Sequence, residues 1–368
     1  MKLLKWAALG CATFVLLLVG TTGAFLVSTD SGRPVADAVV HVVETDELGG
    51  ASLDTEEQLL AYLAKHPDRY ALAAWDVGHE DAGLFHDADR AWPLASTVKV
   101  IPLLAASEEV AAGRWKLDEP TYDAVDQLWL PGTDGDAHPQ ASADGGTETL
   151  GGALHGMIRF SDNAATDFVL LKLGRARVAA RDGLPEPHPL GAALLLAEES
   201  LDGGADFDER AWARAAQQLE HKHRRKRTGT TLTLAQQEAF ARTLDNRGTP
   251  RAFARLIERL YAEPVAPQTA LARTELEWPM AFASNQQDFE VLATKGGSLP
   301  GVLTGATYGK TKSGQRRVVA LFLHDLPFAT WLGLTRSYAQ QAVERDLLLN
   351  EDALERLRAR LTSADAGR

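Results

Sequence analysis

The chain has 368 residues, of which 45% are hydrophobic and 24% are charged. At roughly 100 to 200 residues per domain, this length predicts two lobes around a large core, and the composition excludes wholesale disorder and a polytopic membrane protein. The net charge of −12 argues against nucleic acid as a partner, because nucleic-acid binding requires neutralisation of phosphates. The one cysteine, Cys11, lies in an apolar N-terminal run, so we expect neither a disulfide nor a metal site in the folded part.

The N-terminus has the features of an export segment. Lys2 and Lys5 precede an uncharged stretch from Trp6 to Val27 that is long enough to cross a bilayer as a helix. Thr22-Gly23-Ala24 also fits the cleavage site of a secretory signal. Residues 1–28 are therefore interpreted as a signal peptide or an N-terminal membrane anchor, and either one predicts export of the rest of the chain.

After a polar spacer at residues 29–50, the chain begins with a helix and a hairpin. Asp54 and Glu57 have the spacing of a capping box. The first elements are expected at about 55–66 for the helix, and at 70–77 and 82–86 for the two strands.

A helical block and three strands follow. Apolar spacing predicts a helix from Thr97 to about Gly113, a long loop to Gly146, and a mainly helical stretch over 148–262. The later elements are expected as strands at 289–295, 302–310 and 317–324 and as one final helix at about 335–361. This order predicts an α/β (α+β) fold in which terminal helices flank a five-stranded antiparallel sheet with an inserted all-helical lobe.

The same order predicts the domain organisation. We expect one domain over residues 51–362. The expected α/β lobe comprises 51–96 and 286–362, the expected helical lobe comprises 97–285, and a tail follows at 363–368.

The first motif that indicates chemistry is Ser96-Thr97-Val98-Lys99, where a strand gives way to a helix. A serine hydroxyl is a poor nucleophile until a base removes its proton, and Lys99 lies on the same helical face one turn later. The backbone N–H of Ser96 is suited to stabilise an oxyanion. Taken alone, the motif also fits a capping serine with an exposed lysine.

Ser161-Asp162-Asn163 is the second motif, between two expected helices. All three residue types are good helix caps, and Asp162 is interpreted as one. In a catalytic interpretation, Ser161 returns a proton to the leaving group and the amide of Asn163 orients the substrate or Lys99.

The third motif is Lys295-Gly296-Gly297-Ser298, expected at the end of a strand. It could be a turn with an exposed lysine. In the catalytic interpretation, Lys295 is a fixed cation, Gly297 allows close backbone approach, and the N–H of Ser298 completes an oxyanion hole.

Together the motifs resemble those of class A β-lactamases and penicillin-binding serine acyltransferases, which carry Ser-x-x-Lys, Ser-Asp-Asn and Lys-Thr-Gly in this order. The resemblance covers roughly residues 50 to 360. It implies a fold with a helical insertion in a five-stranded sheet, and β-lactam substrates.

The sequence departs from that pattern in two places. Gly296 stands where the family has threonine or serine, so a hydroxyl that meets a substrate carboxylate is missing, and Thr294 or Ser298 are candidates to replace it. The deacylating glutamate of class A β-lactamases has a weak counterpart in Glu186, whose alternative interpretation is a surface loop. Glu198 and Glu199 are nearer in spacing, but their alternative interpretation is a solvated helix face. Which residue activates the deacylating water stays open.

Two further segments are interpreted as surface features. His138 lies in an expected turn-rich loop at the edge of the cleft, without the spacing of a zinc site. The basic run 221–227 is interpreted as an exposed connector.

These patterns predict an exported serine hydrolase that opens a β-lactam or an amide through a serine acyl-enzyme, without a cofactor. The alternatives are a penicillin-binding D,D-peptidase that acts on peptidoglycan peptides, and a sensor module that stays acylated. We expect a monomer that contacts the membrane through its N-terminal segment if that segment is uncleaved.

Overall fold

The computed structural model describes residues 53–129, 137–144, 148–178, 183–190, 237, 240–242 and 245–365. The predicted signal or anchor, the spacer up to residue 50 and the basic run 221–227 lie outside these residues. Within the described ranges, no helix is both long and apolar enough to span a bilayer.

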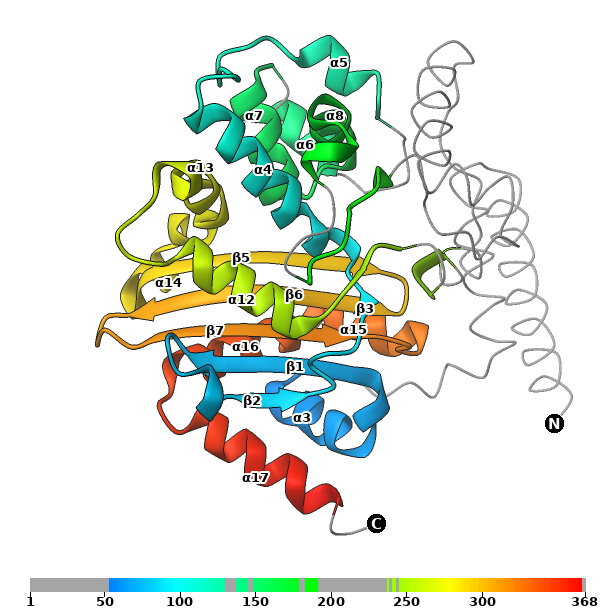
Figure 1. Ribbon diagram of the computed structural model, residues 1–368. Coiled ribbons are helices and arrows are strands. Elements are labelled where there is room, and N and C mark those ends of the chain that lie inside the picture. The colour runs from blue at the N-terminus through cyan, green and yellow to red at the C-terminus, as the bar shows by residue number, and fades with distance from the viewer. Residues whose placement is uncertain are drawn as a thin grey trace, which may run out of the picture.

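The centre of the fold is a five-stranded antiparallel sheet with the order β2-β1-β7-β6-β5, as the sequence predicts (Figure 1). Its strands are β1 (Tyr70–Asp76), β2 (Leu84–His86), β5 (Phe289–Leu299), β6 (Val302–Thr311) and β7 (Arg316–Leu323). β7 is buried along most of its length and pairs with β1 and β6, which joins the two ends of the chain in one sheet.

The first and last helices cover one face of this sheet. α3 (Glu56–Lys65) begins with a capping box formed by Thr55 and Gln58, one residue later than the predicted pair. α3 packs against α16 (Ala339–Leu349) and α17 (Ala353–Asp365), and α16 lies on β6 and β7.

The single final helix expected over 335–361 is wrong. The chain forms α15 (Phe328–Ser337), α16 and α17 instead, with breaks at Tyr338 and Asn350. Tyr338 adopts a left-handed conformation (φ 57°), and Asn350 is extended. Neither position carries a glycine or proline, so the sequence holds no strong local stop.

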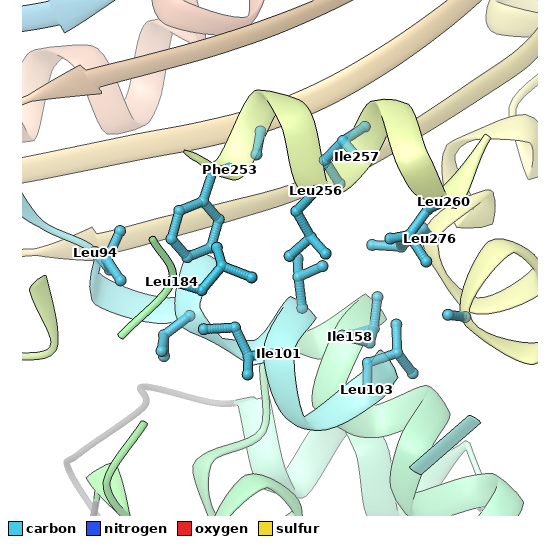
Figure 2. Packing of buried hydrophobic residues seen from close by; sticks show 14 of the residues in the cluster. Leu94, Ile101, Leu103, Ile158, Leu184, Phe253, Leu256, Ile257, Leu260 and Leu276 are labelled. Carbon is cyan, nitrogen blue, oxygen red and sulfur yellow. The ribbon is translucent and has the colours of Figure 1, made fainter. Parts of the chain in front are cut away.

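The opposite face is covered by α12 (Pro250–Leu260), which packs on β7, β6 and β1. Its other side meets the helical part of the chain, and Figure 2 shows Phe253 and Leu256 directed from α12 toward Leu184 and Ile101. One hydrophobic core therefore continues from the sheet through α12 into the helices around α4.

The other described helices lie beyond α12, except α14, which packs on β5 at the edge of the sheet (Figure 1). They are α4 (Val100–Ala111), α5 (Tyr122–Asp126), α6 (Ala137–Ala143), α7 (Leu150–His155), α8 (Asn163–Leu173), α13 (Pro267–Leu276) and α14 (Ala283–Asp288). The 3₁₀ turns outside the site are η2 (Pro67–Arg69), η3 (Glu80–Ala82), η6 (Arg175–Arg177) and η7 (Trp278–Ala281).

The expected long loop before Gly146 is wrong in part, because it contains α5 and α6. These helices have five and seven residues, which is too short for a clear helical period in the sequence. Their position depends on contacts with α8 and with the π-helical turn that precedes it.

Candidate active site

Ser96 lies where a short two-stranded ribbon leads into a helix. β3 (Trp92–Pro93) pairs with β4 (Arg247–Gly248), and the chain then enters the 3₁₀ turn η4 (Ala95–Lys99), which continues into α4. Ser96 is partly exposed, whereas the other four residues of this turn are buried. The turn thus presents one hydroxyl from a well-packed support.

The residue before Ser96 has a strained backbone. Ala95 adopts φ 44°, in the left-handed region that non-glycine residues rarely occupy. Its N–H donates a 2.7 Å hydrogen bond to Oδ2 of Asp245, which is 5% exposed. Sequence reasoning missed Asp245, because this contact joins residues 150 positions apart and no motif surrounds the aspartate.

Gly297 brings the edge strand β5 against this turn. A Cβ built on Gly297 would lie 2.6 Å from the backbone nitrogen of Ser96 and 2.7 Å from the carbonyl oxygen of Leu94. Because real Cβ atoms do not approach so closely, only glycine allows this contact, as the motif predicts. The third motif lies inside β5, which runs to Leu299, and the predicted strand end at Lys295 is too early.

Lys99 is completely buried and points into the site. Its Nζ donates to the backbone oxygen of Ser161 at 2.5 Å and to Oδ1 of Asn163 at 2.7 Å, and it lies 3.3 Å from Oγ of Ser161. The second motif therefore holds the amine of the first motif at a fixed position.

The shape of the second motif depends on two local features. The π-helical turn η5 (Gly156–Phe160) ends at Ser161, which is left-handed (φ 64°). Asp162 then caps α8 by accepting hydrogen bonds from the two backbone N–H groups of Ala164 and Ala165, as expected. This cap turns Ser161 and Asn163 toward Lys99.

His138 supports the same cap, and its expected place in a surface loop is wrong. It lies in α6 with 2% exposure, and its Nδ1 is 2.9 Å from Oδ2 of Asp162. Its ring also stacks on Trp129. Burial opposes the charged imidazole, but the hydrogen bonds to Asp162 and Asp126 outweigh burial and raise the pKa of His138.

Lys295 approaches from the opposite wall. It is 3% exposed, and its Nζ donates to Oγ of Ser161 at 3.0 Å and to the carbonyl of Gly296 at 2.5 Å. Burial, and then the charge of Lys99, hold the pKa of Lys295 well below the usual lysine value. The hydroxyl of Ser161 thus accepts hydrogen bonds from both lysines, which leaves its own proton available to a third group.

A cavity of about 570 Å³ opens beside these groups. Its wall includes Ser96, Ser161, Asn163, Gly297 and Ser298, so the structure brings all the predicted site residues to one place, with Lys99 and Lys295 buried behind the wall. The volume falls in the range of small-molecule sites.

The two candidates for the missing hydroxyl at position 296 are placed differently. Thr294 lies outside the wall, and its Oγ1 is 2.8 Å from that of Thr307. Ser298 is exposed in the cavity, and its Oγ accepts a 3.1 Å hydrogen bond from the indole of Trp331.

Glu186 contacts the guanidinium of Arg175, eleven residues earlier in the chain. It is not among the described residues that line the cavity. The other candidates for the deacylating base, Glu198 and Glu199, lie outside the described residues. In the part of the chain that the structure describes, no cluster of three or more histidine, cysteine, aspartate or glutamate side chains could hold a metal ion.

Comparison with known proteins finds a family whose sequence model matches part of the chain. Residues 54–184 match the sequence model of the β-lactamase enzyme family named Beta-lactamase2. No curated protein matches the sequence.

Three solved structures illustrate the structural similarity. The class A β-lactamase of the last common ancestor of Gram-negative bacteria (GNCA4) is 16% identical, over 79% of this chain and 99% of that chain, with a TM-score of 0.47. The β-lactamase from Sphaerobacter thermophilus DSM 20745 is 19% identical over 77% and 96%, with a TM-score of 0.46. The β-lactamase from Desulfarculus baarsii DSM 2075 is 16% identical over 78% and 97%, with a TM-score of 0.45.

The stretch matched by the family model contains Ser96, Lys99, Ser161 and Asn163. It confirms the predicted resemblance to the β-lactamase-like serine hydrolases for this part of the chain.

Proposed function

We propose that this protein is a serine hydrolase that opens a β-lactam or an amide through an acyl-enzyme on Ser96. The observation that carries the proposal is that Lys99 and Lys295 both donate hydrogen bonds to the hydroxyl of Ser161. Ser161 and Ser96 line the same cavity. A nucleophile, an amine and a proton-carrying hydroxyl are the groups that acyl transfer requires.

In the acylation step, Oγ of Ser96 bonds to the substrate carbonyl carbon while its proton passes to Lys99. This requires the neutral amine of Lys99, and the two lysines that share the hydroxyl of Ser161 oppose each other's positive charge. The backbone N–H groups of Ser96 and Ser298 stabilise the oxyanion, since the contact at Gly297 places β5 directly against Ser96.

The C–N bond then breaks, and the leaving nitrogen takes the proton of Ser161. That hydroxyl regains a proton from Lys99, whose Nζ lies 3.3 Å away. Asn163 keeps the amine in place through its 2.7 Å hydrogen bond. Water finally hydrolyses the ester, which returns the proton to Ser96 and releases the acid.

The final hydrolysis requires a base that activates the water. Because Glu186 contacts Arg175 and is not among the described lining residues, it is a poor candidate to activate the water. This favours a second candidate function, in which the protein is acylated and releases the product slowly, as a penicillin-binding peptidase or a sensor would.

The N-terminal pattern of Lys2, Lys5 and the apolar run supports export, with the segment retained as an anchor or cleaved. We propose a monomer that acts on the outer side of the membrane.

A fluorescent penicillin and a chromogenic cephalosporin, each tested at high concentration, separate these functions. Multiple turnovers of the cephalosporin support the hydrolase, whereas stable labelling without turnover supports the peptidase or the sensor. Equal labelling of wild type and Ser96→Ala would remove Ser96 as the nucleophile.

A further inference from the structure

The cavity extends past the reacting groups, across the edge strand β5 and onto α15. Its wall includes Ser96 and Asn163, and also Trp331 and Thr335 of α15 and Gln341 of α16. Asp245 is the only ionisable side chain among the described residues of the wall, and it is buried. The described surface that a bound molecule meets is therefore neutral.

The part of the wall that β5 contributes, which we call the passage, includes Gly296. Gly296 is exposed, and a Cβ built on it would come no closer than 3.6 Å to any neighbour, the carbonyl oxygen of Thr304. The space that a side chain would occupy therefore belongs to the cavity. Gly297, by contrast, has no room for a Cβ.

The hydroxyls near this passage do not provide a carboxylate site. The hydroxyl of Thr307 donates its proton to the carboxylate of Glu344 at 2.9 Å. In the 2.8 Å contact between Thr307 and Thr294, Thr294 is therefore the donor. Thr304 donates to the backbone oxygen of Leu94 at 2.8 Å. Both protons are thus committed to buried acceptors.

Ser298 is the remaining hydroxyl, and its surroundings are those of an amide site. Its oxygen accepts from the indole of Trp331, and its own proton is donated to no described residue. Lys295 directs its ammonium toward Ser161 and the carbonyl of Gly296. A carboxylate needs two or three donors to offset its desolvation, whereas a neutral carbonyl needs one.

From these contacts we infer that the site selects a substrate whose group beside Gly296 and Ser298 is neutral. This group is an amide, where a penicillin carries a carboxylate. We infer also that another part of this substrate lies on the surface formed by Trp331 and Thr335 of α15 and by Gln341 of α16, which we call the α15 shelf. Its indole offers a flat apolar contact, and the threonine and glutamine offer neutral hydrogen bonds, which suits a peptide-like chain.

This inference rests on the proposed acylation of Ser96, so the test separates the two. A penicillin with its free carboxylate is compared with its methyl ester and its carboxamide, which carry the same reactive ring. Acylation rates are measured by intact-protein mass spectrometry, with Ser96→Ala as the background.

We expect the two neutral compounds to acylate Ser96 at least tenfold faster than the acid. Acylation by the acid at an equal or higher rate would overturn the inference while leaving the proposed function intact. Acylation by none of the three, at any concentration, would refute the proposed function itself.

Gly296→Thr tests the passage. It adds the missing hydroxyl where the cavity has room, and we expect it to raise the ratio of acid to carboxamide rates about tenfold. An unchanged ratio in the folded variant contradicts the role of position 296.

The α15 shelf is tested with carboxamides that carry a short or a long peptide-like side chain. The exposed Gln341→Ala should lower the apparent affinity for the long compound about tenfold, with little change for the short one. Trp331→Ala should weaken both compounds, and the long one more, because its indole also donates to Ser298. Equal effects on both compounds, or none, would overturn the shelf. Because Gln341 is exposed, its variant keeps the test valid if Trp331→Ala does not fold.

Discussion

The backbone nitrogen of Ser96 lies so close to Gly297 that a Cβ there would approach it to 2.6 Å. This contact joins the turn that carries the proposed nucleophile to the strand that carries Lys295. The two halves of the site are therefore held together by main-chain packing as well as by side chains.

Gly297→Ala should consequently lower the acylation rate by roughly 100-fold or more, the scale of losing an oxyanion-hole donor. The added methyl group must push β5 away from Ser96 and Leu94. Gly333→Ala is the control, since a Cβ at Gly333 in α15 has no neighbour within 4 Å. Stopped-flow acylation and thermal unfolding check both variants, and near wild-type acylation in Gly297→Ala would contradict the packing argument.

Asp245 is a positioning residue for Ser96, because it holds the N–H of Ala95 in its left-handed conformation. Burial raises the pKa of Asp245 to about 7, against the opposing hydrogen bond from Ala95. The hydrogen bond is stronger to the ionised carboxylate, so we expect acylation to rise as the pH increases through about 7. Asp245→Asn should remove that rise while keeping the fold.

The measurement is the acylation rate of both proteins from pH 5 to pH 9, with the melting temperature recorded at each pH. A rise of the same size in Asp245→Asn would show that the titrating group is elsewhere.

Asp162→Ala removes a helix cap and also the buried partner of His138. We expect a loss of about 2 to 4 kcal/mol in the free energy of unfolding, because an N-cap contributes about 1 kcal/mol and an unpaired buried group adds to the cost. Acylation should fall as well, since Asp162 lies between Ser161 and Asn163.

Thr249→Ala is the matched control, because the side chain of Thr249 also caps a helix, α12, and Thr249 is not among the described residues that line the cavity. This substitution should lower the free energy of unfolding by about 1 kcal/mol and leave the acylation rate near that of the wild type. Chemical denaturation gives both free energies, and equal effects of the two variants on acylation would argue against a role of Asp162 in arranging the site.

Glu344 predicts a pH dependence of stability. It lies in α16 against Thr307 and Gln340, and burial raises its pKa to about 7 from 4.5. Because the folded state holds the proton more tightly than the unfolded state, Glu344 contributes stability below about pH 4.5 that is lost as the pH rises through about 7. The loss is roughly 3 kcal/mol at most.

Glu344→Gln should reduce the decrease in the free energy of unfolding between about pH 4.5 and pH 7. At pH 8 the variant should have a higher free energy of unfolding than the wild type. Glu355→Gln, at an exposed position in α17, is the control and should not change the curve. Urea unfolding at several pH values checks this, and parallel curves for wild type and Glu344→Gln would contradict it. Asp245 acts in the same direction, so some decline remains in the variant.

The sequence alone determined which chemistry to look for. Ser96 and Lys99 are one helical turn apart, and local geometry is enough to place them together. Alternation of apolar and polar residues in segments before and after the helical block predicted the strands of the sheet, because this periodicity is a local property of the sequence.

Local sequence did not determine the breaks around Tyr338 and Asn350. A left-handed tyrosine is unfavourable by itself, and it persists because α16 packs on β6 and β7 while Trp331 of α15 donates to Ser298 of β5. The short helices α5 and α6 replace parts of the expected loop for a related reason, since neither helix is long enough to be stable without its contacts.

The supports of the site were decided only in three dimensions. Asp245 meets Ala95 across 150 positions, and His138 meets Asp162 across 24, so no spacing rule points to either. These polar residues support the site because they are buried, and a buried carboxylate or imidazole forms hydrogen bonds with groups that the fold brings next to it. The sequence supplied the reactive groups, and the tertiary structure fixed what holds them and how much room a substrate has beside Gly296.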